Sequence, residues 1–105
     1  MFRHIVLFRI HDDVSDTRVT DAINELRSLA ALPGVRSWVV ELSLDERKGR
    51  VVVEDATFSS ADAFRTFHAH PRHVQAGKHM SLISDWWNGD YLTSPPGLPV
   101  EAQQA

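Results

Sequence analysis

The residues that follow Met1 alternate in a way that is typical of a strand covered on both sides. From Phe2 to Ile10 the even positions form one face of an extended chain and the odd positions form the other. Val6 and Phe8 lie on the even face, whereas Leu7 lies on the odd face. Because both faces are apolar at the centre, the sequence predicts helices on one side and a second cover on the other.

An amphipathic helix is predicted next. Apolar residues recur at spacings of three and four from Val19 to Leu29 or Ala30, and Ser15 is placed to cap the helix. Pro33-Gly34 predicts a turn at its end. Two strands are then predicted, Val35–Leu44 and Arg50–Phe58.

A polar hairpin loop over 45–49 joins these two strands. Ser59 with Asp62 resembles a capping box, which predicts a short helix that Pro71 interrupts. A further helix is predicted from about His73 to Trp86. After a turn at 88–89, a last strand is predicted over 90–93.

The predicted order is strand, helix, strand, strand, helix, strand. This is the ferredoxin-like, or split βαβ, arrangement of the α+β class, with one antiparallel sheet and its helices on one side. The other sheet face is apolar, and a second copy laid sheet to sheet would cover it. We therefore expect a homodimer with a barrel-like core.

Length and composition restrict the function. With 105 residues and a net charge of −3, the chain is expected to form one domain over 1–93, with a proline-rich tail over 94–105. A nucleic-acid partner is not expected, because no basic face is evident. Cysteine is absent, which excludes disulfides and thiolate sites. No apolar run is long enough to span a membrane, and we expect a soluble cytoplasmic protein.

Several short motifs stand in a distinctive order around this pattern. They are Phe2-Arg3-His4-Ile5-Val6-Leu7-Phe8, Leu32-Pro33-Gly34-Val35, His70-Pro71-Arg72-His73 and Asp90-Tyr91. In this order and spacing, over 2–93, the chain resembles the stress-responsive dimeric α/β-barrel (Dabb) family. The resemblance implies the same fold that the periodicity predicts.

The resemblance also implies candidate site residues. One plant member of the family closes a linear polyketide by an aldol-type condensation without metal or cofactor, using the second His of the HPxH motif as general acid and base. That residue matches His73. The assisting Tyr of that enzyme matches Phe67, which lacks a hydroxyl, and an aliphatic pocket position matches Glu54. The remaining matched positions are His4, Asp90, Val6 and Phe8.

The residues leave alternatives open at each position. His73 is either a proton-transfer group or a turn histidine bonded to backbone. His4 is either a buried core histidine or part of the site, with Asp90 orienting its imidazole. Glu54 is either a base inside the barrel or a carboxylate that is solvated or paired with Arg9 or Arg3.

The other polar and aromatic candidates have equally plain alternatives. Of the adjacent Trp86 and Trp87, one is expected in the core and the other at the barrel mouth or the dimer interface. Tyr91 either contacts a ligand or packs at a dimer interface. A metal cluster of His68, His70, His73 and His79 is not expected, because Pro71 disturbs the spacing and no third ligand is evident.

Three functions compete. The first is a cofactor-independent, polyketide cyclase-like enzyme that binds a hydrophobic, oxygenated small molecule and uses His73, with His4, as acid and base. The second is a cofactor-free monooxygenase of the same fold. The third is a non-catalytic, stress-related dimeric binding protein. Each has no cofactor and no metal.

Overall fold

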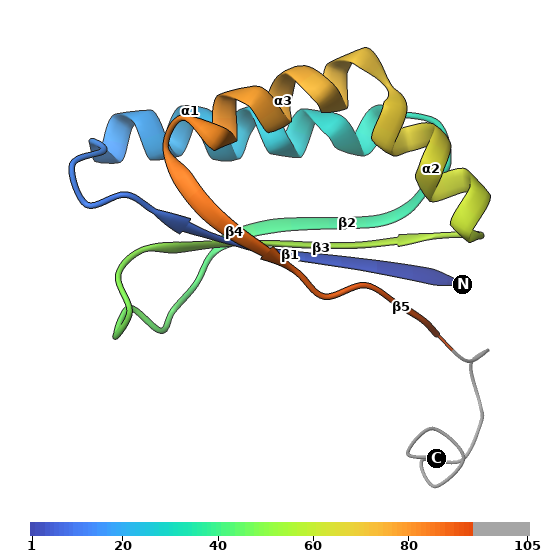
Figure 1. The fold of residues 1–105 in the computed structure, drawn as a ribbon, viewed down its shortest axis with the longest axis horizontal. Coiled ribbons are helices and arrows are strands. Elements are labelled where there is room, and N and C mark those ends of the chain that lie inside the picture. Colours follow the sequence, from blue (N-terminus) through green and yellow to red (C-terminus); the bar gives the residue numbers. More distant parts are fainter. Residues whose placement is uncertain (94–105) are drawn as a thin grey trace, which may run out of the picture.

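The predicted order of elements is confirmed in the computed structural model, which describes residues 1–93 (Figure 1). The predicted tail over 94–105 lies outside the described residues. The elements are β1 (Phe2–Ile10), α1 (Asp16–Ser28), the short 3₁₀ helix η1 (Leu29–Ala31), β2 (Val35–Leu42), β3 (Val51–Phe58), α2 (Ala61–Ala69), α3 (Pro71–Ser81), β4 (Ser84–Asn88) and β5 (Tyr91–Leu92).

β1 lies inside an antiparallel sheet of order β2-β3-β1-β4, and β5 pairs with the first residues of β1. This order is that of a ferredoxin-like fold, so the predicted fold class is correct. Val6 of β1 pairs with Glu54 of β3 on one side and with Asn88 of β4 on the other. Paired residues of adjacent strands share a face, so these three side chains lie next to one another on the sheet.

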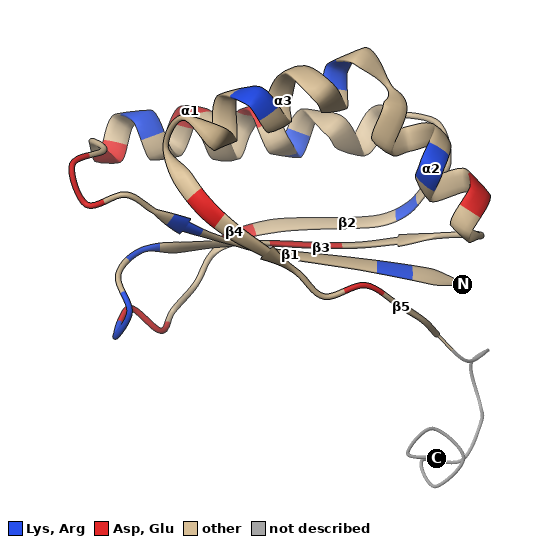
Figure 2. Cartoon of the chain, viewed as in Figure 1, with Lys and Arg blue, Asp and Glu red and all other residues tan. Residues whose placement is uncertain are grey.

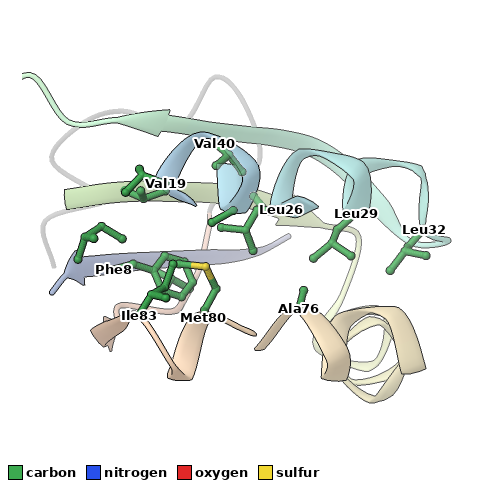
Figure 3. Close-up of a cluster of buried hydrophobic side chains, with 14 of the residues drawn as sticks. Phe8, Val19, Leu26, Leu29, Leu32, Val40, Ala76, Met80 and Ile83 are labelled. Atoms are coloured by element: carbon green, nitrogen blue, oxygen red, sulfur yellow. The ribbon is translucent and has the colours of Figure 1, made fainter. Parts of the chain in front are cut away.

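The helices cover one face of this sheet, and α1 and α3 run side by side above it (Figure 1). His4, Val6, Phe8 and Ile10 of β1 are buried beneath them, which assigns the even face of the strand to the core. The apolar residues of the helices close this layer from above. Figure 3 shows the cluster, with Leu26 and Leu29 facing Ala76 and Met80 across it.

The cap of α2 differs from the prediction by one residue. Ser60, in an extended conformation, accepts a hydrogen bond from the backbone N–H of Ala63 at 3.1 Å. Ser59 precedes the cap, so the expected role of Ser59 is wrong. Two adjacent serines offer the same cap chemistry, and the backbone conformation selects the second one.

Pro71 starts a helix instead of merely interrupting one. It occupies the first turn of α3, where a missing N–H costs little, and His70 caps the helix by accepting from the backbone N–H of Arg72 at 3.1 Å. α3 ends at Ser81, so the helix expected from His73 to Trp86 is too long.

The fourth strand begins earlier than predicted. Trp86 and Trp87 belong to β4 and pair with Phe8 and Leu7 of β1. The predicted last strand over 90–93 is reduced to the two residues of β5. β2 also ends two residues early, which leaves Leu44 in the loop and fully exposed.

The sheet face opposite the helices is apolar at its centre. Leu7 is 42% exposed, and its paired neighbours there are Val53 of β3 and Trp87 of β4, the latter 63% exposed. Val39 of β2 extends the patch. Elsewhere basic and acidic residues are interspersed, as along α1 and in the β2–β3 loop (Figure 2).

Candidate functional site

A pocket of about 270 Å³ opens between the sheet and the helix layer. Its floor comes from β1, β3 and β4, and its walls come from α1, η1, α3 and the end of α2. Several of the wall residues belong to the cluster of Figure 3. The lining residues are His4, Val6, Phe8, Leu26, Leu29, Glu54, His68, His73, Val74, Ala76, Gly77, Met80, Trp86 and Asn88.

Three ionisable side chains form a line that starts at the floor of this pocket, where Glu54 and His4 line it, and ends at Asp90 behind His4. Nδ1 of His4 lies 2.7 Å from Oδ1 of Asp90, and Nε2 of His4 lies 3.1 Å from Oε2 of Glu54. His4 and Glu54 are each 2% exposed. Asp90 also accepts from the backbone N–H of Ile5 at 3.3 Å, which holds it against β1.

A carboxylate on each side of the ring favours the doubly protonated form of His4. Burial by itself lowers the pKa of His4, but Glu54 and then Asp90 raise it, and the pKa lies above its ordinary value. An imidazolium between two carboxylates leaves one negative charge in the set. We call these three residues, Glu54, His4 and Asp90, the acidic array.

His73 lies on the first turn of α3 and lines the pocket. Its Nδ1 is 3.0 Å from the backbone oxygen of His68. A carbonyl oxygen only accepts, so Nδ1 carries the proton and Nε2 of the neutral ring carries the lone pair. Burial, and next the charge of His68, lower the pKa of His73, which favours this neutral form.

The carboxylate of Glu54 is not paired with either arginine that the sequence offered. Arg3 instead makes a two-point ion pair with Asp55, with Nε at 2.9 Å and Nη2 at 2.6 Å from the two carboxylate oxygens. Arg9 contacts Asp12 and the backbone of the β2–β3 loop. Strand alternation therefore turns Glu54 into the pocket and Asp55 to the opposite sheet face.

The pocket brings together most of the predicted site residues and leaves three outside its lining, Phe67, Tyr91 and Asp90. Val6, Phe8 and Trp86 line it together with His4, Glu54 and His73. Phe67 is buried in the core instead, where its ring lies 4.9 Å from both Phe58 and His73. Tyr91 is half exposed on β5. Asp90 acts on the pocket through His4 and does not line it.

Some lining residues carry no clear signal in the sequence. Asn88 precedes a glycine, so it indicates a turn, although its pairing with Val6 places it on the pocket floor. Gly77 lies mid-helix on α3, and a Cβ built there meets nothing within 4 Å. A glycine in a helix interior is the one sequence hint that α3 leaves space at this point.

The other histidines have separate partners. His70 caps α3, and Nδ1 of His79 lies 2.8 Å from both carboxylate oxygens of Glu25. Within residues 1–93, no group of three or more His, Asp or Glu side chains is arranged to hold a metal ion. Over the same range, no helix has both the length and the apolar character needed to cross a membrane.

The fold and the pocket define a class, a ferredoxin-like α+β protein with a ligand-sized cavity beneath its helices. The family model described as Stress responsive A/B Barrel Domain (Dabb) matches residues 2–91. The chain therefore belongs to the Dabb family, which confirms the resemblance seen in the sequence. A comparison with curated protein sequences gives no match.

Solved structures of the same fold differ in what they do. A dimeric ferredoxin-like protein of unknown function from Thermobifida fusca is 26% identical, covers 88% of this chain and 90% of its own, and has a TM-score of 0.79. Hydroxynitrile lyase from Passiflora edulis is 21% identical, and the match covers 93% of this chain and 96% of the lyase, with a TM-score of 0.78. SnoaB, a cofactor-independent oxygenase from Streptomyces nogalater, is 18% identical, and the match covers 91% of this chain and 95% of SnoaB, with a TM-score of 0.73.

Proposed function

We propose that this protein binds a hydrophobic, oxygenated small molecule in the pocket and transfers protons on it without a cofactor, as a polyketide cyclase-like enzyme. The observation that carries the proposal is the hydrogen bond between the ring of His73 and the backbone carbonyl of His68. Nδ1 of His73 is occupied by this carbonyl, which leaves Nε2 as the basic nitrogen in a pocket lined mainly by apolar side chains. A neutral imidazole in this setting is suited to general acid–base catalysis near neutral pH.

The proposed chemistry needs only groups that this chain supplies. Nε2 of His73 takes a proton from a carbon beside a carbonyl, and the electron pair moves onto the carbonyl oxygen. The side-chain amide of Asn88 lines the same pocket and can donate to that oxygen. The resulting carbon nucleophile adds to a second carbonyl of the same molecule, and His73 returns the proton to the new alkoxide.

Hydrogen–deuterium exchange at the carbon beside a ketone tests the first step. Aryl and alkyl 1,3-diketones are incubated with the protein in D₂O, and exchange is followed by NMR. The wild-type protein is expected to accelerate exchange, and His73→Gln is expected to reduce that acceleration to background. His79→Gln is the matched control, because His79 contacts Glu25 and does not line the pocket. Full activity in His73→Gln would eliminate His73 as the base.

A cofactor-free monooxygenase is the second candidate, because Trp86 and Asn88 line the pocket beside His73. This candidate predicts consumption of dissolved oxygen with the same ketones. Exchange without oxygen uptake favours the acid–base reaction. Binding of a ketone without exchange and without oxygen uptake favours a non-catalytic binding protein.

We further propose that two copies pair through the apolar sheet face that carries Leu7, Val39, Val53 and Trp87. This face lies opposite the helices, so pairing would leave the helix side free. The Thermobifida fusca protein and a ferredoxin-like protein from Bacteroides fragilis are both described as dimeric. Covering an apolar patch of this kind is the usual reason for such pairing.

A further inference from the structure

Apart from its histidines, the side chains that line the pocket are more acidic than basic. Its lining includes Glu54 and four other polar or ionisable side chains, but within the described residues it includes neither lysine nor arginine. The basic residues of β1 are directed elsewhere, Arg3 to Asp55 and Arg9 to Asp12. Figure 2 marks the acidic stretch of β3 and the acidic residue before β5 that supply the two carboxylates of the array.

The acidic array has no donor left for a ligand. Each ring nitrogen of His4 already faces a carboxylate, so His4 offers neither an N–H nor a lone pair to the cavity. Among residues 1–93, His4 is the one ion-pair partner of Glu54. A carboxylate has acceptor capacity for more than one donor, and Glu54 lines the pocket while it is 2% exposed.

We propose, resting on the pocket function above, that the ligand is neutral or cationic and places a hydroxyl or N–H donor on the carboxylate of Glu54, and that carboxylate ligands are excluded. Even with His4 protonated, the acidic array keeps one negative charge, which repels a second carboxylate, and the cost is largest where water is excluded. The same carboxylate strengthens a hydrogen bond from a neutral donor. Glu54 is thus the specificity-determining residue of the pocket.

Four ligands with one ring system and different polar groups test this inference. They are 2-naphthol, 2-methoxynaphthalene, 2-naphthoate and 2-naphthylmethylammonium, each titrated at neutral pH against the Trp86-containing pocket by fluorescence and by calorimetry. The naphthol and the ammonium ligand are expected to bind at least about tenfold more tightly than the naphthoate. The methoxy compound has no donor and is expected to fall between them.

Two variants separate the charge of Glu54 from charge in general. Glu54→Gln keeps the shape, and the discrimination against naphthoate is expected to fall to within about threefold. Asp55→Asn removes one negative charge from the neighbouring position of β3, where the side chain faces away from the pocket, and should leave the discrimination unchanged. The wild-type ranking does not depend on whether either variant folds, and circular dichroism checks that both do.

The outcomes separate this inference from the function on which it rests. If 2-methoxynaphthalene binds and naphthoate binds as tightly as naphthol, the charge selection is wrong while the apolar pocket stands. If Glu54→Gln and Asp55→Asn weaken the discrimination equally, Glu54 is not its source. If none of the four ligands binds, the pocket function is wrong and the inference fails with it.

Discussion

Two histidines of the pocket, His4 and His73, have pKa values shifted in opposite directions. Both can be followed by NMR titration of their ring protons. His73 is expected to titrate below 6.5, because burial and the charge of His68 disfavour its protonated form. Glu54→Gln is expected to lower the pKa of His73 further, since the charge of Glu54 raises it. A midpoint for His73 at or above 6.5 would contradict the assignment of this ring as a neutral base.

The raised pKa of His4 in the acidic array makes the folding stability depend on pH. The folded-state pKa of His4 is raised, so its contribution is fully present below the unfolded value of about 6.5 and is lost as pH rises through the raised value. Asp90→Asn removes a charge-assisted hydrogen bond and is expected to cost about 1 to 3 kcal/mol at pH 6 and less at pH 9. Denaturant unfolding at both pH values measures this.

The control for that experiment is Asp85→Asn. Asp85 is exposed on β4 and lies 3.5 Å from the ring of His11. Asp85→Asn therefore removes the same charge as Asp90→Asn without changing the acidic array. Its effect is expected to be small at both pH values. A loss for Asp90→Asn that is equal at pH 6 and pH 9 would show that charged His4 is not the partner that matters.

At the level of elements, the start of α2 tests which serine caps the helix. Ser60→Ala removes the acceptor for the N–H of Ala63 and is expected to cost about 1 kcal/mol of unfolding free energy. Ser59→Ala is the matched control and is expected to change stability by less than about 0.5 kcal/mol. Equal losses in thermal or denaturant unfolding would mean that the cap is shared.

The elements also show what local pattern predicts and what it misses. The sequence predicts β1 with its bounds and α1 with its cap, because period two and period 3.6 are strong over these lengths. The predicted end of the helix at Leu29 or Ala30 falls in η1 instead, since α1 ends at Ser28. β4 was missed because Trp86 and Trp87 follow a helical stretch without a strong stop signal. Pairing with Phe8 and Leu7 of β1 decides that they are extended. This contact joins distant parts of the chain, and no local window contains it.

The same limit applies to the site. His4 and Glu54 stand out in the sequence as polar residues within apolar strands, His73 is a candidate through the resemblance to the family, and the structure places all three at one cavity. The pairing of Glu54 with His4 was not predicted. It depends on the register of β1 against β3, which sets Val6 opposite Glu54, and a shift of one residue would send Glu54 to the other face.

For the whole molecule, the apolar sheet face determines the assembly that we expect. Leu7 lies at the centre of this face, so Leu7→Lys places a charge where a second copy would pack, and the variant is expected to be monomeric at micromolar concentration. Leu82→Lys is the control, because Leu82 is 74% exposed at the end of α3 on the helix side. Light scattering should give twice the chain mass of 11.8 kDa for the wild type and for Leu82→Lys. A monomeric wild type would leave Leu7, Val39 and Trp87 exposed to water and would overturn the pairing.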